Sequence, residues 1–179
     1  MLIHITGASG SGASTLGAAL ASELELKHLD GDDYYWIPSD PPFQQKRPGP
    51  ERLAKLRADV ESSGSAVISG SIMGWGAEVE DIFDLIVFLY LPAEIRVARL
   101  RRRELERYGM VDDAFLEWAG QYDGNPSEGR SLAKHEAWLK ERRCPVLRLK
   151  GDETVEQRVA QVRRCPTPRS TPDSLRQAV

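Results

Sequence analysis

The chain has 179 residues, of which 41% are hydrophobic and 28% charged, a length and balance that fit one globular domain with a well-buried core. Its formal net charge of -3 argues against a general nucleic-acid binder or a protein of membrane surfaces. The two cysteines, Cys144 and Cys165, form neither a metal-binding spacing nor a disulfide framework, and no apolar stretch approaches the ~18 residues of a membrane span. We therefore expect a cytoplasmic protein, monomeric or homodimeric, without a nucleic-acid or membrane partner.

Apolar runs and turn residues predict strands that alternate with helices. Strands are expected at residues 2–6, 27–33, 65–71, 84–91 and 145–151, and helices at 14–24, 50–64, 93–107, 112–122, 132–142 and 153–164. The run DLIVFLYL at 84–91 is typical of a central parallel strand, because it is apolar almost throughout. Residues 36–50 contain five prolines, which predicts no regular element, and the Pro-, Ser- and Thr-rich residues 165–179 predict a disordered tail.

This alternation predicts a three-layer α/β fold with a parallel sheet of about five strands. Ligands of such sheets bind at the carboxyl ends of the strands. That edge would bring together residues 7–15, residues 30–33, residues 69–76 and the segment after Pro92. We therefore expect the functional site there.

The sequence ITGASGSGASTLG at residues 5–17 is close to a phosphate-binding P-loop. Gly7 and Gly12 have the required spacing, but Ala13 stands where the pattern has lysine. Glycines between a strand and a helix leave backbone N–H groups and the positive end of the helix dipole free to bind an anion, and this mechanism needs no lysine. The candidate phosphate-binding residues are Gly7, Ala8, Ser9, Gly10, Ser11, Gly12, Ala13, Ser14 and Thr15.

Two other interpretations of these glycines remain open. Short-chain dehydrogenases also begin with Thr-Gly-Ala-Ser, and Asp30 or Asp32 could bind the ribose of NAD(P). Their glycines, however, fall one residue later, and no tyrosine here has the lysine four positions on that they use. Alternatively, the glycines only form a tight turn, with Ser14 as the cap of the next helix.

Longer segments carry a family resemblance. The loop GASGSGAST resembles the GxxGSGKST loop of P-loop nucleoside and metabolite kinases, and the carboxylates after the second strand resemble those of shikimate-kinase-like and adenylate-kinase-like enzymes. VFLYLPAEIRVARLRRRE looks like the strand and arginine helix before their lid, and LRLKGDETVEQRV is similar to their last strand, loop and helix. The resemblance covers about residues 1–163 and implies a three-layer α/β/α P-loop NTPase fold at 1–164, with a small lid insert at about 104–130 and a substrate-side segment at about 34–64.

The same resemblance implies ATP and Mg²⁺ as cofactors and a phosphoryl transfer to a small hydroxylated or nucleotide-like metabolite. Ser14 and Asp30 would hold Mg²⁺, and Asp32 would accept the proton of the acceptor hydroxyl. In an extended segment Asp30 and Asp32 would share one face and Asp33 would point away. Alternatively, the three carboxylates lie in a solvated turn without a catalytic role. The candidate substrate residues are Asp30, Asp33, Trp36, Ser71 and Arg130.

The helix after Pro92 carries arginines spaced by three, four and four residues: Arg96, Arg99, Arg103 and Arg107. This spacing predicts four guanidinium groups on one face, which either is solvated or stabilises charge on a transferring phosphate. Arg99 and Arg103 match arginines of the kinases and are, with Asp32, the candidate catalytic residues. The missing lysine leaves two hypotheses: an arginine replaces it in an active enzyme, or the chain is a nucleotide-binding regulatory module without chemistry.

Overall fold

The computed structural model describes residues 1–124, 126 and 129–165 of the chain. The segment expected to be a disordered tail, 165–179, lies outside the described residues except for Cys165. Within the described part, no helix is both long and apolar enough to cross a membrane.

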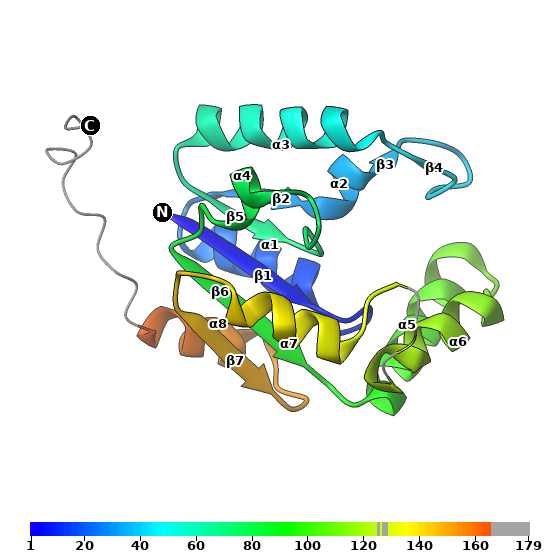
Figure 1. Ribbon diagram of the computed structural model, residues 1–179. Helices are drawn as coiled ribbons and strands as arrows, with labels where there is room; N and C mark the ends of the chain where they lie inside the picture. The colour runs from blue at the N-terminus through cyan, green and yellow to red at the C-terminus, as the bar shows by residue number, and fades with distance from the viewer. Residues whose placement is uncertain (125, 127–128, 166–179) are drawn as a thin grey trace, which may run out of the picture.

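Five parallel strands form the central sheet in the order β2-β5-β1-β6-β7 (Figure 1). Their bounds are Leu2–Gly7 for β1, Lys27–Asp30 for β2, Ala66–Ser69 for β5, Leu85–Tyr90 for β6 and Val146–Lys150 for β7. β1 lies in the middle, where Ile5 pairs with Ser69 of β5 and with Val87 of β6. The side chains of β5 and β6 are buried except at Tyr90, because helices cover both faces of the sheet.

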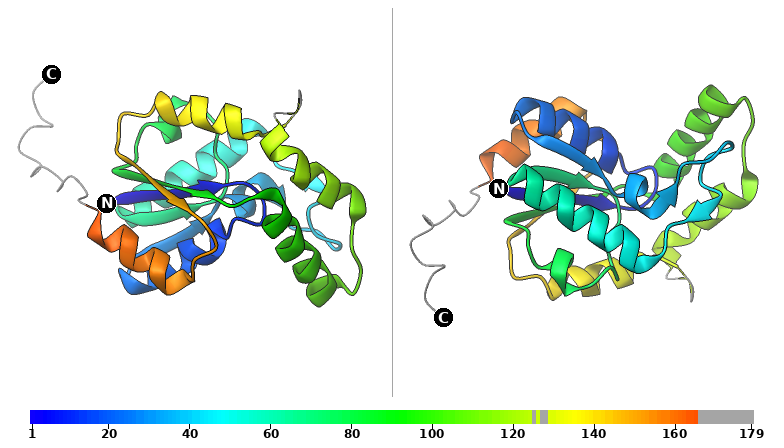
Figure 2. Two further views of the ribbon diagram at one scale, coloured as in Figure 1. Left: turned by 90° about the horizontal axis from the view of Figure 1, so that it is seen from below. Right: turned by 90° about the horizontal axis from the view of Figure 1, so that it is seen from above.

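The helices on the two faces complete the three layers (Figure 2). One face carries α1 (Ala13–Glu23) and α8 (Val155–Arg164), and the other carries α3 (Gly49–Ser63), α4 (Ala77–Glu80) and α7 (Leu132–Lys140). Pro50 stands in the first turn of α3, and Gly64 ends this helix with a φ of 64°. Thr154 and Gln157 form a capping box that starts α8.

Two smaller groups of elements flank the carboxyl ends of the strands (Figures 1 and 2). The first comprises α5 (Ala93–Tyr108), α6 (Asp113–Gly120) and the 3₁₀ turn η1 (Gln121–Gly124). It has a small core of its own, built from Leu100, Leu116 and Ala119. The second comprises α2 (Gly31–Tyr35), β3 (Trp36–Ile37) and β4 (Gln45–Lys46).

The prediction that residues 36–50 contain no regular element is wrong. β3 and β4 form a short antiparallel pair, with Trp36 opposite Lys46. The five prolines of this segment all lie outside the two strands, so the N–H groups of the strands remain free to pair.

The predicted three-layer α/β fold with a five-stranded parallel sheet is confirmed. The order of the strands also decides between the two glycine-loop folds. In a dinucleotide-binding Rossmann sheet the first strand lies beside the second, whereas here β1 lies between β5 and β6 and β2 is at the edge. This order rules out the dehydrogenase fold.

Candidate functional site

The loop between β1 and α1 has the geometry of an anion-binding turn. Gly10 and Gly12 have φ values of 83° and 92°, which L side chains rarely adopt. A Cβ on Gly10 would lie 2.6 Å from the carbonyl oxygen of Arg96, so the loop also needs glycine for space. Gly12 is the N-cap of α1 and provides no side-chain hydrogen bond, which leaves the first N–H groups of the helix uncapped by a side chain. Ser14 is therefore not the cap; it is exposed within the first turn.

Arg96 is fully buried against this loop, so the prediction of four guanidinium groups on one solvated or phosphate-stabilising face is wrong for this residue. It donates hydrogen bonds to the carbonyl oxygens of Leu91 and Ala119, both at 3.0 Å, and of Ser9 at 3.3 Å. Its guanidinium also pairs with the Asp123 carboxylate at 3.2 Å. The start of α5 packs inward against the loop, and Arg96 consequently ties the loop to α6 and η1.

Arg99 and Arg103, the next two arginines of the predicted row on α5, are closer to solvent. Nη1 of Arg99 lies 3.8 Å from where a Cβ on Gly12 would stand, and the same guanidinium forms an ion pair with Asp152. Arg103 pairs with its neighbour Glu104 at 2.9 Å. Arg99 is thus the member of the predicted catalytic pair that lies beside the loop.

The three carboxylates after β2 do not lie on an extended strand. β2 ends at Asp30, whose Oδ1 accepts the N–H of Asp32 at 3.1 Å and caps α2. Asp32 and Asp33 therefore follow one another in a helical turn, and both retain solvent access. Protein atoms nevertheless surround Asp32 on one side: this desolvation, and next the Asp30 carboxylate, raise the pKa of Asp32, while Arg130 and Arg103 oppose the increase.

Arg130 connects the segment before α7 to the glycine loop. Its Nη2 lies 3.4 Å from Oγ of Ser9, and its guanidinium lies over the ring of Trp118, 5.6 Å from the centroid. Burial lowers the pKa of Arg130, whereas the nearby Asp32 carboxylate acts to raise it. The loop, a carboxylate and a guanidinium group are thus brought together in one place.

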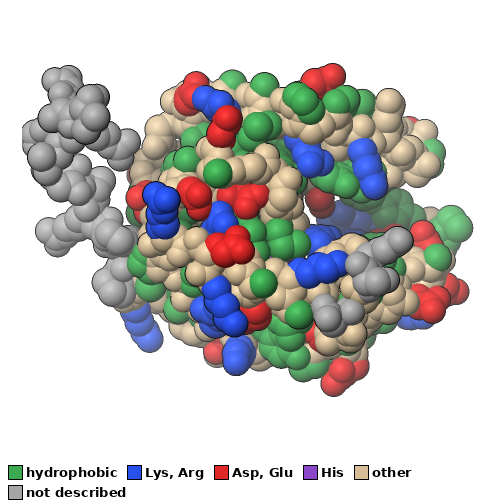
Figure 3. All heavy atoms as spheres, in the orientation of Figure 1, with side chains coloured by type: hydrophobic (Ala, Val, Ile, Leu, Met, Phe, Trp, Pro, Cys, Tyr) green, Lys and Arg blue, Asp and Glu red, His purple; other side chains and the backbone are tan. Residues whose placement is uncertain are grey.

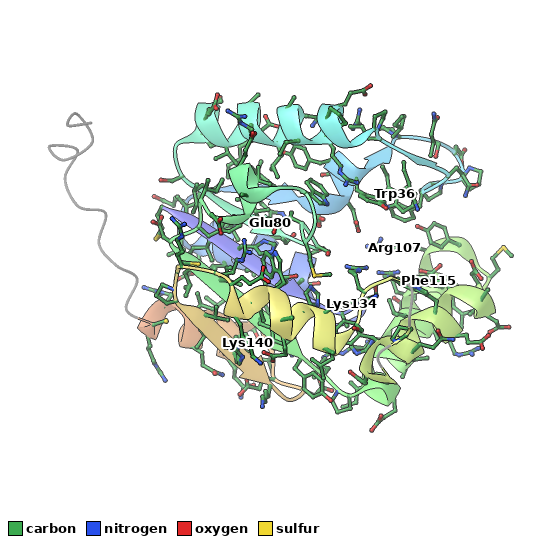
Figure 4. The ribbon with its side chains drawn as sticks, in the orientation of Figure 1. Trp36, Glu80, Arg107, Phe115, Lys134 and Lys140 are labelled. Carbon is green, nitrogen blue, oxygen red and sulfur yellow. The ribbon has the colours of Figure 1, made fainter. Side chains whose placement is uncertain are left out.

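The molecular surface is hollowed between the group of α5, α6 and η1 and the group of α2, β3 and β4, and Lys and Arg side chains border the hollow (Figure 3). Trp36 of β3 lies across this gap from Arg107 of α5 and Phe115 of α6 (Figure 4). Ser71 lies next to α2: its backbone nitrogen is 3.8 Å from where a Cβ on Gly31 would stand.

A second hollow, open to solvent and of about 510 Å³, lies beside α5. Its lining residues are Glu94, Ile95, Ala98, Arg99, Arg102 and Asp152. Arg99, which lines this hollow, also lies next to Gly12 of the loop. Ile95 and Ala98 give it an apolar part between charged groups, a combination that suits a planar ring with polar edges.

Arg158 of α8 is a loop-contacting residue that sequence reasoning missed. It donates from Nη1 to the carbonyl oxygen of Ser11 at 2.9 Å and from Nη2 to that of Gly151 at 3.0 Å. The sequence did contain a signal. Arg158 lies on the same helical stripe as Val155 and Val162, a position where the amphipathic pattern favours an apolar side chain.

Comparison with known proteins agrees with this geometry. Residues 3–115 match the family model described as "AAA domain". The chain belongs to this AAA-domain family. It is 45% identical over 170 residues to the uncharacterized protein YqaC of Bacillus subtilis (strain 168), covering 89% of this chain and 94% of that protein.

A more distant sequence relative of this AAA-domain protein and two of its structural neighbours are named as kinases. A cytidylate kinase of Natronomonas pharaonis is 30% identical over 115 residues, but the match spans only 58% of this chain and 59% of that enzyme. Among solved structures, the shikimate kinase of Acinetobacter baumannii has a TM-score of 0.57 with 15% identity, covering 90% of this chain and 89% of that one. The deoxyadenosine kinase of M. mycoides has a TM-score of 0.58 with 12% identity, covering 91% and 97%. The AAA-domain chain therefore has a P-loop kinase-like fold.

The donor groups of the site suit Mg²⁺ better than a transition metal. No three His, Cys, Asp or Glu residues of the described chain gather to hold a metal ion. Mg²⁺ needs only one or two protein oxygens when nucleotide phosphates and water complete its octahedron. The exposed hydroxyl of Ser14 and the carboxylate of Asp30 are hard oxygen donors of this kind.

Proposed function

We propose that the protein is an ATP-dependent phosphotransferase that moves the γ-phosphoryl group of ATP to a small hydroxylated or nucleotide-like metabolite. The observation that carries this proposal is that Arg130 contacts Ser9 of the glycine loop and also interacts electrostatically with the Asp32 carboxylate. Phosphoryl transfer needs a group that orients the acceptor and takes its proton, and cations that stabilise charge on the transferring oxygens. Asp32 serves the first need, and Arg130 with Arg103 serves the second.

In this proposal the backbone N–H groups of the loop bind the phosphates of ATP at the start of α1. Ser14 and Asp30 hold Mg²⁺, which neutralises part of the charge that develops during transfer. The nucleobase takes the hollow beside α5, next to Arg99. The domain spans residues 1–164, with residues of about 104–130 as a lid that excludes water and residues of about 34–64 on the acceptor side.

The acceptor binds in the gap between the lid and α2. Trp36 provides an aromatic surface there, and the basic side chains on the rim favour an acceptor that carries negative charge. Asp33 of α2 and Ser71, which lies next to α2, would offer hydrogen-bonding groups to a hydroxylated ligand. Because its pKa is raised, Asp32 is a stronger proton acceptor than an ordinary carboxylate.

A second candidate function rests on Ala13. A loop without its lysine retains the amides that bind phosphate but lacks a cation that bridges the β- and γ-phosphates. Losing one such electrostatic stabiliser lowers a catalytic rate on the order of a hundred- to a thousandfold. The alternative is therefore a nucleotide-binding regulatory module without transfer activity.

A melting comparison tests the ligand class. Mg²⁺ with ATP should raise the melting temperature of the protein, whereas NAD(H) and NADP(H) should leave it unchanged, because only a ligand of the native state stabilises it. A rise with NAD(H) and none with ATP would contradict the proposal.

Transfer is tested by measuring ADP release from Mg²⁺ and ATP over a panel of phosphorylatable metabolites. Asp32→Asn should abolish the acceptor-dependent release while the affinity for ATP stays within about threefold, since the change removes the base but not the loop. Glu61→Gln, an exposed substitution on α3, is the matched control and should behave as wild type. If no acceptor stimulates ADP release although ATP binds, the regulatory module is the correct function.

A further inference from the structure

Arg158 of α8, the last helix of the fold, contacts the glycine loop between β1 and α1. Arg158 is 4% exposed, and its Nη1 lies 3.4 Å from where a Cβ on Gly12 would stand. Its two hydrogen bonds go to carbonyl oxygens, of Ser11 in the loop and of Gly151 after β7. The guanidinium therefore lies immediately beside the residue that precedes Ala13.

The guanidinium of Arg158 has no ion-pair partner within the described residues, and its buried Nε has no hydrogen-bond partner there. The acidic residues nearby are engaged elsewhere: Asp152 pairs with Arg99, and Glu153 accepts a hydrogen bond from Gln161. A buried cation without a directly paired counter-ion is unfavourable, so an anion bound beside it would stabilise it.

The direction of the pKa shift of Arg158 is consistent with a positive charge that lacks a directly paired anion. Burial, and next the positive charge of Arg99, lower the pKa of Arg158, and Glu153 and Asp152 only partly oppose them. Two like charges beside one loop repel each other unless an anion binds between or next to them. The phosphates that the loop amides bind are anions of the required kind.

We propose that Arg158 supplies from α8 the positive charge that the loop lacks at Ala13, and that it binds the phosphate chain of the nucleotide. This inference rests on the proposed nucleotide binding. It also accounts for the small residue at 13. A lysine there would place a second cation near a guanidinium that already lies beside Gly12, and the two would repel.

A purely mechanical role for Arg158, as a brace between α8 and the loop, predicts different behaviour. A brace fixes the loop through the carbonyl oxygens of Ser11 and Gly151, and a lysine at position 13 could not replace it. A charge donor, in contrast, can be replaced by any cation that reaches the phosphates. The two roles are therefore separated by restoring the charge from another position.

The experiment measures dissociation constants of Mg²⁺–ATP and of ADP by titration calorimetry for four proteins: wild type, Arg158→Gln, Arg163→Gln, and Arg158→Gln combined with Ala13→Lys. Arg158→Gln should weaken binding roughly ten- to a hundredfold, as expected when a charge-assisted hydrogen bond to phosphate is lost. Arg163→Gln on the same helix, where the side chain is 56% exposed and paired with Glu23, should change affinity by less than about twofold. The double variant should recover to within about threefold of wild type.

The outcomes separate the possible failures. Equal affinities of Arg158→Gln and Arg163→Gln, or a double variant as weak as Arg158→Gln, would overturn the role of Arg158 and leave the proposed function intact. A wild type that binds neither nucleotide would overturn the proposed function itself. If Arg158→Gln does not fold, Arg158→Lys replaces it: an affinity within about threefold of wild type supports a charge role, and a tenfold loss indicates a brace.

Discussion

Replacing Arg96 by Met should destabilise the whole fold, because this buried side chain joins the loop, α5, α6 and η1. Methionine fills a similar length with apolar atoms but leaves the carbonyl oxygens of Leu91, Ser9 and Ala119 without their donor. It also leaves the carboxylate of Asp123, 27% exposed, without its ion pair. Breaking a buried charge pair costs about 3–5 kcal/mol. Since Asp123 can reach water, we expect about 3 kcal/mol.

Urea unfolding followed by circular dichroism measures this free energy directly. A loss of about 3 kcal/mol corresponds to a melting temperature lower by about 6–12 °C for a domain of this size. The matched control is Arg101→Gln on the same helix, because Arg101 forms only an exposed ion pair with Asp113 and should contribute less than about 1 kcal/mol. If Arg96→Met loses no more stability than Arg101→Gln, the argument from burial is refuted.

Two further substitution and pH experiments address the loop and the core. Gly10→Ala should weaken Mg²⁺–ATP binding at least tenfold and lower the melting temperature. The new Cβ would lie 2.6 Å from the carbonyl oxygen of Arg96, and the φ of 83° strains any L side chain. The control Gly49→Ala should have neither effect, because nothing lies within 4 Å of a Cβ at that position. Burial lowers the pKa of His4 to about 3 and that of His135 to about 4, so the unfolded chain binds more protons than the native one below about pH 6.5. The free energy of unfolding, measured by urea titration, should therefore be highest above pH 7 and decrease as the pH falls toward 4. A free energy of unfolding that does not change with pH would contradict this prediction. His135→Gln should reduce this pH dependence.

The sheet and its main helices could be predicted because each rests on a local signal. The run at 84–91 is apolar enough to identify a strand buried on both faces, and β6 occupies Leu85–Tyr90. Pro50 and Gly64 predict the ends of a helix from the sequence alone, and α3 spans Gly49–Ser63. The parallel direction of the strands then follows from the alternation of strands and helices.

The short elements next to the site could not be predicted, because their signals are too brief or too distant. α2 has five residues and no helical period; it forms because the Asp30 side chain caps it. The β3–β4 pair has two residues in each strand. Such pieces depend on tertiary packing, which a local pattern does not contain.

The sequence also does not predict which arginine side chains are buried and which reach solvent. Helical spacing placed Arg96 on a face with Arg99 and Arg103, but spacing does not tell which part of that face is covered. The loop and η1 cover Arg96, whereas Arg99 reaches Asp152 and stays partly in solvent. The sequence alone does not identify Arg158 as a loop contact, because its partner, Ser11, lies at the other end of the chain. Contacts between the last helix and the first loop require the completed sheet.

The loop keeps its shape without lysine because its shape never depended on residue 13. Its turns need Gly10 and Gly12, and two of its carbonyl oxygens accept hydrogen bonds, that of Ser9 from Arg96 and that of Ser11 from the last helix. A lysine in this position acts on the bound phosphates as a point charge, after the loop has formed. Anion binding by the amides and the charge that a cation adds to the bound phosphates are therefore separate properties of the loop. With Ala13 the loop itself provides the first and not the second, and a cation from elsewhere in the fold can supply it.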